Sequence, residues 1–405
     1  MAFGIALSGI HAAQSDLDVT ANNIANSQTT GFKESRALFA ELFAVSSQGV
    51  SSTQTGNGVK VAQVQQQFSQ GNVSATNSSL DLAISGQGFF TLRDGGAAVY
   101  SRAGAFGTDK DGYVVNSSGQ NLQVYLPTGT GSFNTTAPQD LRLVTSDSAP
   151  QPTSEAEVIF NLPADAPQPS VATFDPAVAS SFNNSTSLTV YDSLGAAHTA
   201  SMYFIKQPTA NSWESRLYID GNAVGTPQPL VYSAAGKLTT PVTGTLAFPA
   251  YAPSTGAAPL AVNFDVSKTT QYGSNFGVAS VSQDGFTTGR LIGINVDSTG
   301  VVQARFTNGR SLPLGQIAIA NFANPQGLQA LGNTSWSETF ASGQPLNGQA
   351  GNSGFGLIQS GALEQSNVDI TAQLVNMITA QRNFQANAQM IATQDQIQQA
   401  VINIR

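Results

Sequence analysis

The sequence predicts a mainly β protein with two β-domains, the second inserted in the first, flanked by N- and C-terminal coiled-coil α-helices. Three observations support this fold class. Apolar residues recur at steps of three and four near both ends of the chain, which is the spacing of a helix seam. From Leu80, short segments alternate apolar and polar side chains, as half-buried strands do. Thirteen of the eighteen prolines lie in 145–284, where no helical period occurs, which indicates a separate all-β domain.

The C-terminal segment, 358–405, is predicted to form a long amphipathic helix. Its seam keeps one phase as far as Ile391 and then slips by one position, as at a stammer in a coiled coil. Residues 361–405 contain fourteen Asn and Gln but only five charged residues, which suits a helix that contacts other amide-rich surfaces. The predicted seam residues are Ile370, Leu374, Met377, Phe384, Ile391, Ile397, Val401 and Ile404.

The N-terminal segment, 1–30, repeats this rhythm. Its predicted seam residues are Phe3, Leu7, Ile10, Leu17 and Ile24. Two interpretations fit the pattern: the two helices pack on one globular core, or they associate with other copies into an oligomer or polymer. The near absence of charge favours the second, so we predict that the seam residues mediate self-assembly.

Composition limits the classes of protein to which the chain can belong. With 405 residues, it is long enough for two or three domains. Only 10% of residues are charged, against a usual ~25%. The net charge of −8 argues against a nucleic-acid partner. There is no cysteine, no basic and apolar leader typical of a cleaved signal peptide, and no run of 18 apolar residues, so neither Sec-type secretion nor membrane insertion is expected.

Between the helices the chain divides into four predicted parts. Residues 31–79 form a connector, whose Ser/Thr/Gly/Gln-rich run resembles a linker that orders on assembly. Residues 80–144 and 285–357 form the two parts of the first β-domain. Residues 145–284, which differ in texture from the segments on either side, form the inserted outer β-domain.

No catalytic, cofactor-binding or metal-binding residue is predicted. Neither His11 nor His198 lies near a cluster of carboxylates in sequence, so both are interpreted as packing or solvated side chains. Asp109 and Asp111 precede Gly112 as in a calcium loop, but Gln120 stands where a further acidic ligand is needed, which favours a hairpin turn. Carboxylate pairs such as Glu155 and Glu157 fit a solvated strand face better than a glycosidase site.

Two blocks at opposite ends of the chain resemble the signatures of the bacterial flagellar rod and hook protein family. The first is Asn-Asn-Ile-Ala-Asn at 22–26, followed by Thr-Gly-Phe-Lys at 30–33. The second is Ser-Asn-Val-Asp-Ile at 366–370, followed by Ala-Gln-Arg-Asn-Phe-Gln-Ala-Asn at 380–387. Segments 85–90, 100–104 and 315–324 also fit the family, whereas 146–284 resembles it weakly. The signature residues are Asn22, Asn23, Ile24, Asn26, Gly31, Phe32, Asn367, Asp369, Gln381, Arg382 and Asn387.

The resemblance implies a structural subunit with no enzymatic activity and no cofactor. Within the family, the large insertion favours a hook subunit, which polymerises into a curved, hollow, flexible tube that couples motor torque to the filament. The implied partners are many copies of the chain itself, rod and hook–filament junction proteins, the hook cap and the flagellar export apparatus. The implied location is the extracellular hook, reached without cleavage of a signal peptide. A distal rod subunit of the basal body is the nearest alternative. A secreted adhesive or carbohydrate-binding β-protein and a hydrolase are more distant ones.

Overall fold

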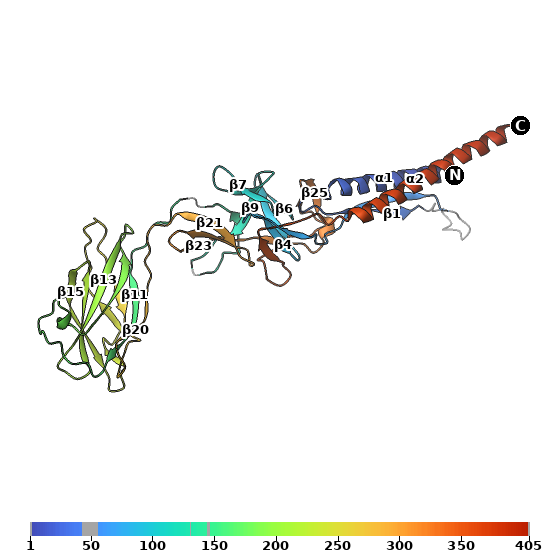
Figure 1. The fold of residues 1–405 in the computed structure, drawn as a ribbon. Helices are drawn as coiled ribbons and strands as arrows, with labels where there is room; N and C mark the ends of the chain where they lie inside the picture. Colours follow the sequence, from blue (N-terminus) through green and yellow to red (C-terminus); the bar gives the residue numbers. More distant parts are fainter. Residues whose placement is uncertain (1, 43–55, 130, 144–145, 404–405) are drawn as a thin grey trace. The chain divides into compact units, whose positions relative to one another are not determined.

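The computed structural model describes residues 2–42, 56–129, 131–143 and 146–403, which form two compact units. Unit 1 consists of residues 1–145, 293–305 and 311–405, and unit 2 of residues 146–292 and 306–310. In the described residues, the α-helices are α1 (Ala2–Ala25) and α2 (Ile370–Asn403), one near each end of the chain (Figure 1). Strands make up most of the remaining regular structure, which confirms the predicted fold class.

Local chemistry explains where the two helices end and begin. α1 ends at Ala25, and Gly31 in the following turn has a φ of +70°, a conformation that glycine adopts at little cost. Asp369 caps the start of α2: its Oδ1 accepts hydrogen bonds from the backbone N–H groups of Thr371 (2.8 Å) and Ala372 (3.2 Å). The helices therefore span less than the predicted segments 1–30 and 358–405.

Two short sheets occupy residues that the sequence assigned to the C-terminal helix. β28 (Leu357–Ser360) pairs with β4 (Leu82–Ser85), and β29 (Ala362–Glu364) pairs with β3 (Val73–Ala75). The expectation of helix at 358–369 was wrong. Gly361, with a φ of +68°, separates the two strands, and helical structure begins only after the cap at Asp369.

The predicted connector, 31–79, also contains regular structure. β1 (Ser35–Glu41) and β2 (Val59–Gln66) form an antiparallel hairpin, with a register shift between Leu38 and Phe39. The expected linker is therefore wrong for these two strands, because both alternate in sequence and pair with each other along their length. Most of the Ser/Thr-rich run, 43–55, lies outside the described residues.

One large sheet forms the body of unit 1. Its central order is β21-β22-β23-β9-β5-β6-β26-β25, so β9, β5 and β6 from the first half of the chain lie between strands from the second half. Leu92, Leu122, Val124 and Ile317 are fully buried in its core. The strands of this sheet are β5 (Phe89–Asp94), β6 (Ala97–Ser101), β7 (Phe106–Thr108), β8 (Val114–Asn116), β9 (Asn121–Tyr125), β10 (Gln139–Asp140), β21 (Leu291–Val296), β22 (Val301–Phe306), β23 (Ser311–Ile317), β24 (Ile319–Asn321), β25 (Gln329–Gly332), β26 (Ser335–Ser337) and β27 (Leu346–Gly348).

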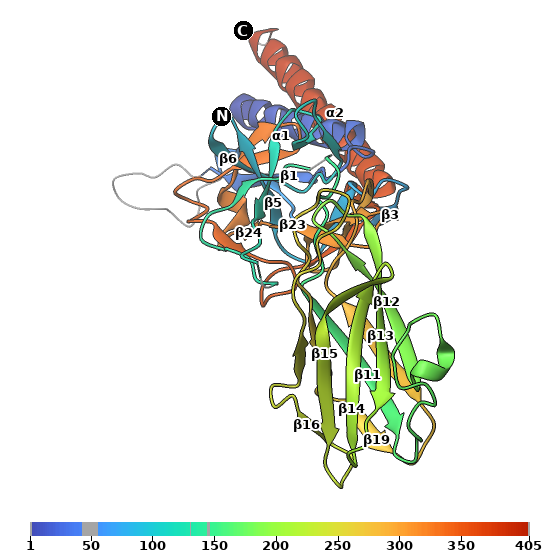
Figure 2. The same ribbon diagram turned by 90° about the vertical axis from the view of Figure 1, so that its left-hand side faces the viewer.

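Unit 2 is built from two five-stranded sheets (Figure 2). One has the order β12-β13-β14-β15-β16. In the other, β11 pairs with β18, β19 and β20, and β17 pairs with β18. Trp213, Phe160, Phe204 and Phe264 belong to one buried core that draws residues from both sheets. The strands are β11 (Glu155–Pro163), β12 (Asn184–Tyr191), β13 (Ala197–Lys206), β14 (Ser212–Ile219), β15 (Asn222–Tyr232), β16 (Leu238–Thr240), β17 (Thr245–Ala247), β18 (Asn263–Asp265), β19 (Thr270–Tyr272) and β20 (Gly277–Gln283).

The limits of unit 2 differ from the predicted insertion, 145–284. The unit continues to 292 and also includes 306–310. Gln151 and Phe286 exchange two backbone hydrogen bonds, and the Arg310 guanidinium lies 4.6 Å from the centroid of the Phe286 ring. These contacts join the two ends of the insertion to a hairpin tip that follows it in sequence. The sequence pattern contained no sign of that hairpin contact.

His198, interpreted from sequence as a packing or solvated side chain, lies between two carboxylates. Its Nδ1 is 2.6 Å from Asp220 Oδ2, and its Nε2 is 3.2 Å from Asp192 Oδ2. Thr255 Oγ1 donates to the same Asp192 oxygen, and the Tyr251 ring packs nearby. Both ring nitrogens face acceptors, which is the arrangement of a protonated imidazole. Burial lowers the pKa of His198, but the two carboxylates outweigh burial and the pKa is raised overall.

We expect the stability of unit 2 to fall as the pH rises through the pKa of His198. A group whose pKa is raised by folding stabilises the folded state below its unfolded pKa and loses that contribution above its folded pKa. Hydrogen bonds to Asp192 oppose the effect of burial and lower the pKa of Asp192 to about 2, so its contribution is lost only in strong acid. Thermal melts between pH 5 and 9 should show this dependence in the unaltered chain and in His11→Gln, but not in His198→Gln. A dependence that persists in His198→Gln would contradict this assignment.

Candidate assembly surface at the chain termini

The first signature block lies at the end of α1, where it connects the helix to β1 and α2. Asn23 is almost fully buried: its Nδ2 donates to the Ser35 backbone O (2.7 Å), and its Oδ1 accepts from the Ser35 backbone N–H (2.9 Å). The same Nδ2 also donates to Gln373 Oε1 (3.2 Å) on α2. One asparagine amide of α1 thus satisfies polar groups of two other elements, β1 and α2, which requires a side chain with both a donor and an acceptor at this position.

The second signature block closes the same junction from the other end of the chain. Asn367 Oδ1 accepts from the Glu34 backbone N–H (2.7 Å), and Asn367 Nδ2 donates to the Gln67 backbone O (2.8 Å). Gly31 packs so closely on the backbone of Ala103 that a Cβ there would lie 2.5 Å from the Ala103 nitrogen. Asn26 holds the turn after α1 by donating to the Asn22 backbone O (3.0 Å). The signature residues therefore join the helices to the body of unit 1.

A buried ion cluster lies at the centre of this junction. We call Lys33, Arg102 and Glu364 the junction cluster. Lys33 Nζ is 2.6 Å from Glu364 Oε1, and Arg102 Nη1 is 3.2 Å from Glu364 Oε2; the side chains of Lys33 and Glu364 have no exposed surface, and that of Arg102 is 5% exposed. Each residue comes from a different part of the chain: the turn after α1, the end of β6 and β29. Charged residues are rare in this chain, so these three could be noticed in the sequence. Their spacing in sequence did not indicate that they form ion pairs with one another.

Backbone carbonyls complete the junction cluster. Lys33 Nζ donates to the Ser69 O (2.7 Å), and Arg102 Nη2 donates to the Gly86 O (2.8 Å). The cluster contains two cations but one carboxylate, and these carbonyl oxygens stabilise the positive charge that Glu364 does not balance. Burial lowers the pKa of Lys33, and Glu364 partly opposes this effect. The cluster therefore depends on Glu364, its only anion.

The two terminal helices pack antiparallel through small and polar side chains. Gln373 on α2 lies against Asn23, and Asn387 lies against Gly9 so closely that a Cβ at Gly9 would be 2.5 Å from Asn387 Oδ1. Ala380, between them on α2, is fully buried. Within residues 3–25 of α1, the buried residues are Ala6, Ala12, Ala13, Thr20 and Asn23. Small residues permit this close approach, and larger side chains would separate the helices.

The predicted seam of α1 is therefore not the face that α1 buries in its own chain. Ala6 and Asn23 are buried, and each precedes a predicted seam residue, Leu7 or Ile24, by one position, which turns the buried face by about 100°. Phe3 and Leu7 are 48% and 40% exposed. The other seam residues of α1, Ile10, Leu17 and Ile24, are half-buried.

On α2 the predicted seam divides into two groups. Met377, Phe384 and Ile391 are half-buried, whereas Ile370, Leu374 and Ile397 are 46–52% exposed. Ile404 lies outside the described residues. Val401 lies within the helix. Ile370, Leu374 and Ile378 are spaced by four residues and so lie on one side of the helix. We call these three residues, together with Phe3 and Leu7 of α1, the exposed apolar set. Their side chains leave apolar surface of both helices in contact with water.

The remaining signature residues of α2 follow no single pattern. Gln381 and Arg382 are exposed, and neither forms a hydrogen bond or ion pair with the described residues. Asn387 is half-buried and donates to the Asn383 backbone O (2.8 Å) besides contacting Gly9. Gln381 and Arg382 are therefore available for contacts outside their own chain.

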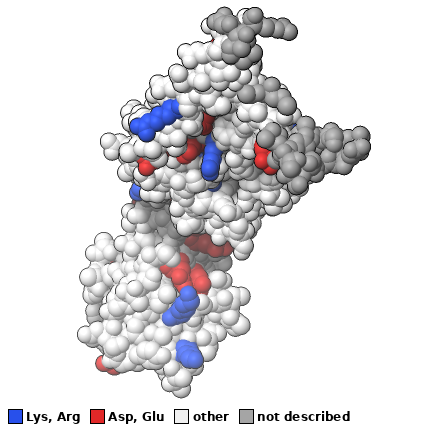
Figure 3. All heavy atoms as spheres, turned by 90° about the vertical axis from the view of Figure 1, so that its right-hand side faces the viewer, with Lys and Arg blue, Asp and Glu red and all other residues white. Residues whose placement is uncertain are grey.

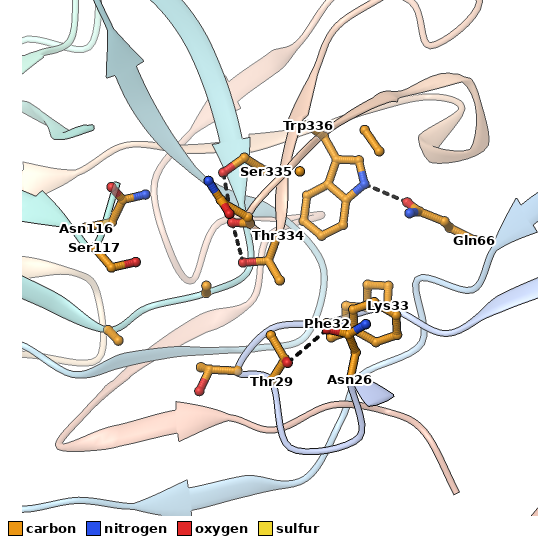
Figure 4. Close-up of a pocket in the computed structure, with 16 residues that line it drawn as sticks. Asn26, Thr29, Phe32, Lys33, Gln66, Asn116, Ser117, Thr334, Ser335 and Trp336 are labelled. Carbon is orange, nitrogen blue, oxygen red and sulfur yellow. Dashed lines mark hydrogen bonds between the residues drawn. The ribbon is translucent and has the colours of Figure 1, made fainter. Parts of the chain in front are cut away.

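A pocket of about 550 Å³ opens beside the junction (Figure 4). Phe32 and Lys33 line it from the turn after α1, and Trp336 lines it from β26. Trp336 Nε1 donates to Gln66 Oε1 (2.6 Å), the contact drawn at the right of the figure. The lining contains amides and hydroxyls but no carboxylate. Among the described residues, no group of three or more His, Asp or Glu side chains is arranged to hold a metal ion.

Charged side chains are sparse on the surface. On the face shown in Figure 3, Lys, Arg, Asp and Glu form small, separate patches on an otherwise uncharged surface. No helix in 2–42, 56–129, 131–143 or 146–403 is long and apolar enough to cross a membrane.

Four segments of the chain match known families. Residues 3–33 match the family described as flagella basal body rod protein, and residues 359–404 match the C-terminal family of flagellar basal body rod FlgEFG proteins. Residues 83–156 match the flagellar hook protein FlgE/F/G D1 domain, and residues 161–286 match the flagellar basal body protein FlaE D2 domain. These matches define the class: an axial protein of the bacterial flagellum.

Similar whole proteins narrow this class. The chain is 40% identical to the flagellar hook protein FlgE of Escherichia coli (strain K12) and 38% identical to that of Salmonella typhimurium, in both cases over 100% of each chain. The crystal structure of Helicobacter pylori flagellar hook protein FlgE2 has a similar fold, with a TM-score of 0.54 and 16% identity, over 72% of this chain and 100% of that one. The chain belongs to the flagellar hook protein family, and its function is that of a structural subunit of the hook. Full-length similarity to hook proteins decides between the hook and the distal rod, the nearest alternative.

Proposed function

We propose that the chain polymerises with copies of itself into a curved, hollow, flexible tube that passes torque from the motor to the filament. In this proposal the terminal helices form the inner wall, and the β-structure of the two units forms the outer layers. The observation that carries it is the exposed apolar set. Exposed apolar residues at regular helical spacing near both ends of a chain are typical of a surface that another copy covers.

The placement of the seam residues supports different roles for two faces of each helix: one packs within the chain, and the other contacts neighbouring copies. Small residues pack α1 against its own chain, while Phe3, Leu7, Ile370 and Leu374 remain outside that contact. Sparse charge lets neighbouring surfaces shift without breaking ion pairs, and the amide-rich face of α2 exchanges hydrogen bonds at little cost. We assign self-assembly to the whole predicted seam on this basis.

The proposal includes the route and the neighbours of the subunit. We propose export through the flagellar export apparatus without cleavage of the N-terminus, location in the extracellular hook, and contact with the hook cap, rod proteins and hook–filament junction proteins. The support is membership of the hook protein family.

Electron microscopy of the purified, polymerised chain tests the proposed function. We expect curved tubes with a central channel. Straight tubes would indicate a rod-like role, and a chain that stays monomeric at high concentration would contradict self-assembly. The monomer fraction of the same preparation, imaged in parallel, is the control for particles that arise from drying on the grid.

A further inference from the structure

The loop between β26 and β27 exposes one aromatic side chain completely. Phe340 has a relative exposure of 105%, the largest of the exposed apolar residues. No aromatic pair or apolar cluster of the described residues includes it. Apolar side chains are driven to bury surface, so a large one held fully in water indicates a surface that another molecule covers.

Hydrogen bonds fix the loop that carries Phe340. Thr339 Oγ1 accepts from the backbone N–H groups of Ala341 (3.1 Å) and Ser342 (3.2 Å). Ser342 Oγ accepts from the Thr339 N–H (2.9 Å) and donates to the Thr339 O (2.9 Å), and Ser342 is fully buried. Phe340 therefore lies at the tip of a closed turn, not on a loose segment.

The segment 324–327 packs against the turn and holds it in place. Asn324 Nδ2 donates to the Ala341 O (2.9 Å), and Gly327 lies so close that a Cβ there would be 2.5 Å from the Ala341 carbonyl carbon. Trp336, a few residues before the loop, is packed edge-on against Phe68 and Phe89. A rigid base of this kind means that little conformational entropy is lost when the aromatic ring is buried in an interface.

The surface around Phe340 fits a protein neighbour of low charge. A hollow of about 450 Å³ adjoins the ring, lined by Glu338, Thr339, Phe340, Gly343 and Gln344. The Tyr100 hydroxyl donates to Glu338, the one charged residue of this group (3.2 Å). The projecting Phe340 ring can enter a pocket on another protein, and the adjacent hollow can receive a side chain from it.

We propose that Phe340 is an anchor residue of the contact between one copy of this chain and the next in the polymer. This inference rests on the proposed function. A second copy is the occupant because membership of the hook family implies polymerisation, and because the surfaces of other copies have the same low charge as this loop. A projecting group that meets a different surface on an identical neighbour makes a head-to-tail contact, which extends as a filament instead of closing.

Single-cysteine labelling tests the inference, because the chain contains no cysteine. A trace of Phe340→Cys copolymerised with excess unaltered chain should react with a maleimide at least tenfold more slowly in the polymer than as a monomer. Phe340→Ala should raise the critical concentration about tenfold, whereas Phe340→Tyr should leave it unchanged. Neither variant should shift the melting temperature of the monomer, because Phe340 is fully exposed and packs on none of the described residues.

The outcomes separate this inference from the proposed function. If the unaltered chain polymerises but Phe340→Cys reacts equally fast in both states, Phe340 is not at a contact and the inference is wrong. An unchanged critical concentration for Phe340→Ala leads to the same conclusion. If the unaltered chain does not polymerise at all, the proposed function fails, and the inference fails with it.

Discussion

A chain with glutamine in place of Glu364 is expected to have a unit 1 that is about 3–5 kcal/mol less stable. The substitution leaves Lys33 and Arg102 buried with no anion between them. Removal of one member of a buried ion group costs far more than loss of a surface pair, because the remaining charge cannot reach water. For a unit of this size the loss corresponds to a fall in melting temperature on the order of 10 °C. Differential scanning calorimetry of the monomer measures it.

Two further variants identify the cause of the loss. Asp111→Asn removes a surface pair with Lys110 from the same unit, where the two side chains are 56% and 87% exposed, and should leave the melting temperature unchanged. Lys33→Met leaves Glu364 paired with Arg102, so it should destabilise unit 1 less than Glu364→Gln does. If Glu364→Gln melts like the unaltered chain, the junction cluster is not what joins the helices to the body.

Serine at both Leu374 and Ile378 is expected to raise the critical concentration for polymerisation about 10- to 100-fold. These side chains are 46% and 50% exposed in the single chain, so each still has about half of its surface to bury. Complete burial of one such side chain contributes about 1.5–3 kcal/mol, and every 1.4 kcal/mol changes an equilibrium constant tenfold. Sedimentation of polymer at a series of concentrations measures the change.

The monomer provides the contrast for this prediction. Ala380 is fully buried where the two helices are closest, so Ala380→Leu should lower the melting temperature of the monomer by overpacking that contact. The double serine variant should not. If it lowers the melting temperature and leaves polymerisation unchanged, Leu374 and Ile378 pack within their own chain and the exposed apolar set has no role in assembly.

Periodicity and the proline-rich composition of 145–284 were sufficient to predict the fold class. The three-four rhythm at both ends predicted the terminal helices, and the alternation from Leu80 onward predicted strands, because both signals are local; the start of α2 and the hairpin of β1 and β2 were missed. The rotated face of α1 could not be predicted in this way. Ala6, Ala13 and Thr20 are buried because they are small enough for a close contact, and periodicity of large apolar residues does not record that preference.

Contacts between distant parts of the chain were also beyond prediction. Glu364 stood next to a recognised signature block, but nothing in the spacing paired it with Lys33 and Arg102. Asp220 lies 22 residues after His198 in sequence, and strand pairing between β13 and β14 brings the two together. In both cases the sheet topology creates the site, and that topology cannot be obtained from one sequence.

The unequal lengths of the helices have a mechanical consequence. Gln373 lies opposite Asn23, and Asn387 lies opposite Gly9, so an antiparallel pair in this register reaches the start of α1 near residue 394 of α2. The nine residues from 395 to 403 extend beyond it, about 13 Å at 1.5 Å per residue. A copy that covers this overhang is displaced along the axis by that length. In the proposed polymer, the ends of neighbouring copies would then be staggered along the axis and overlap, as in a lap joint.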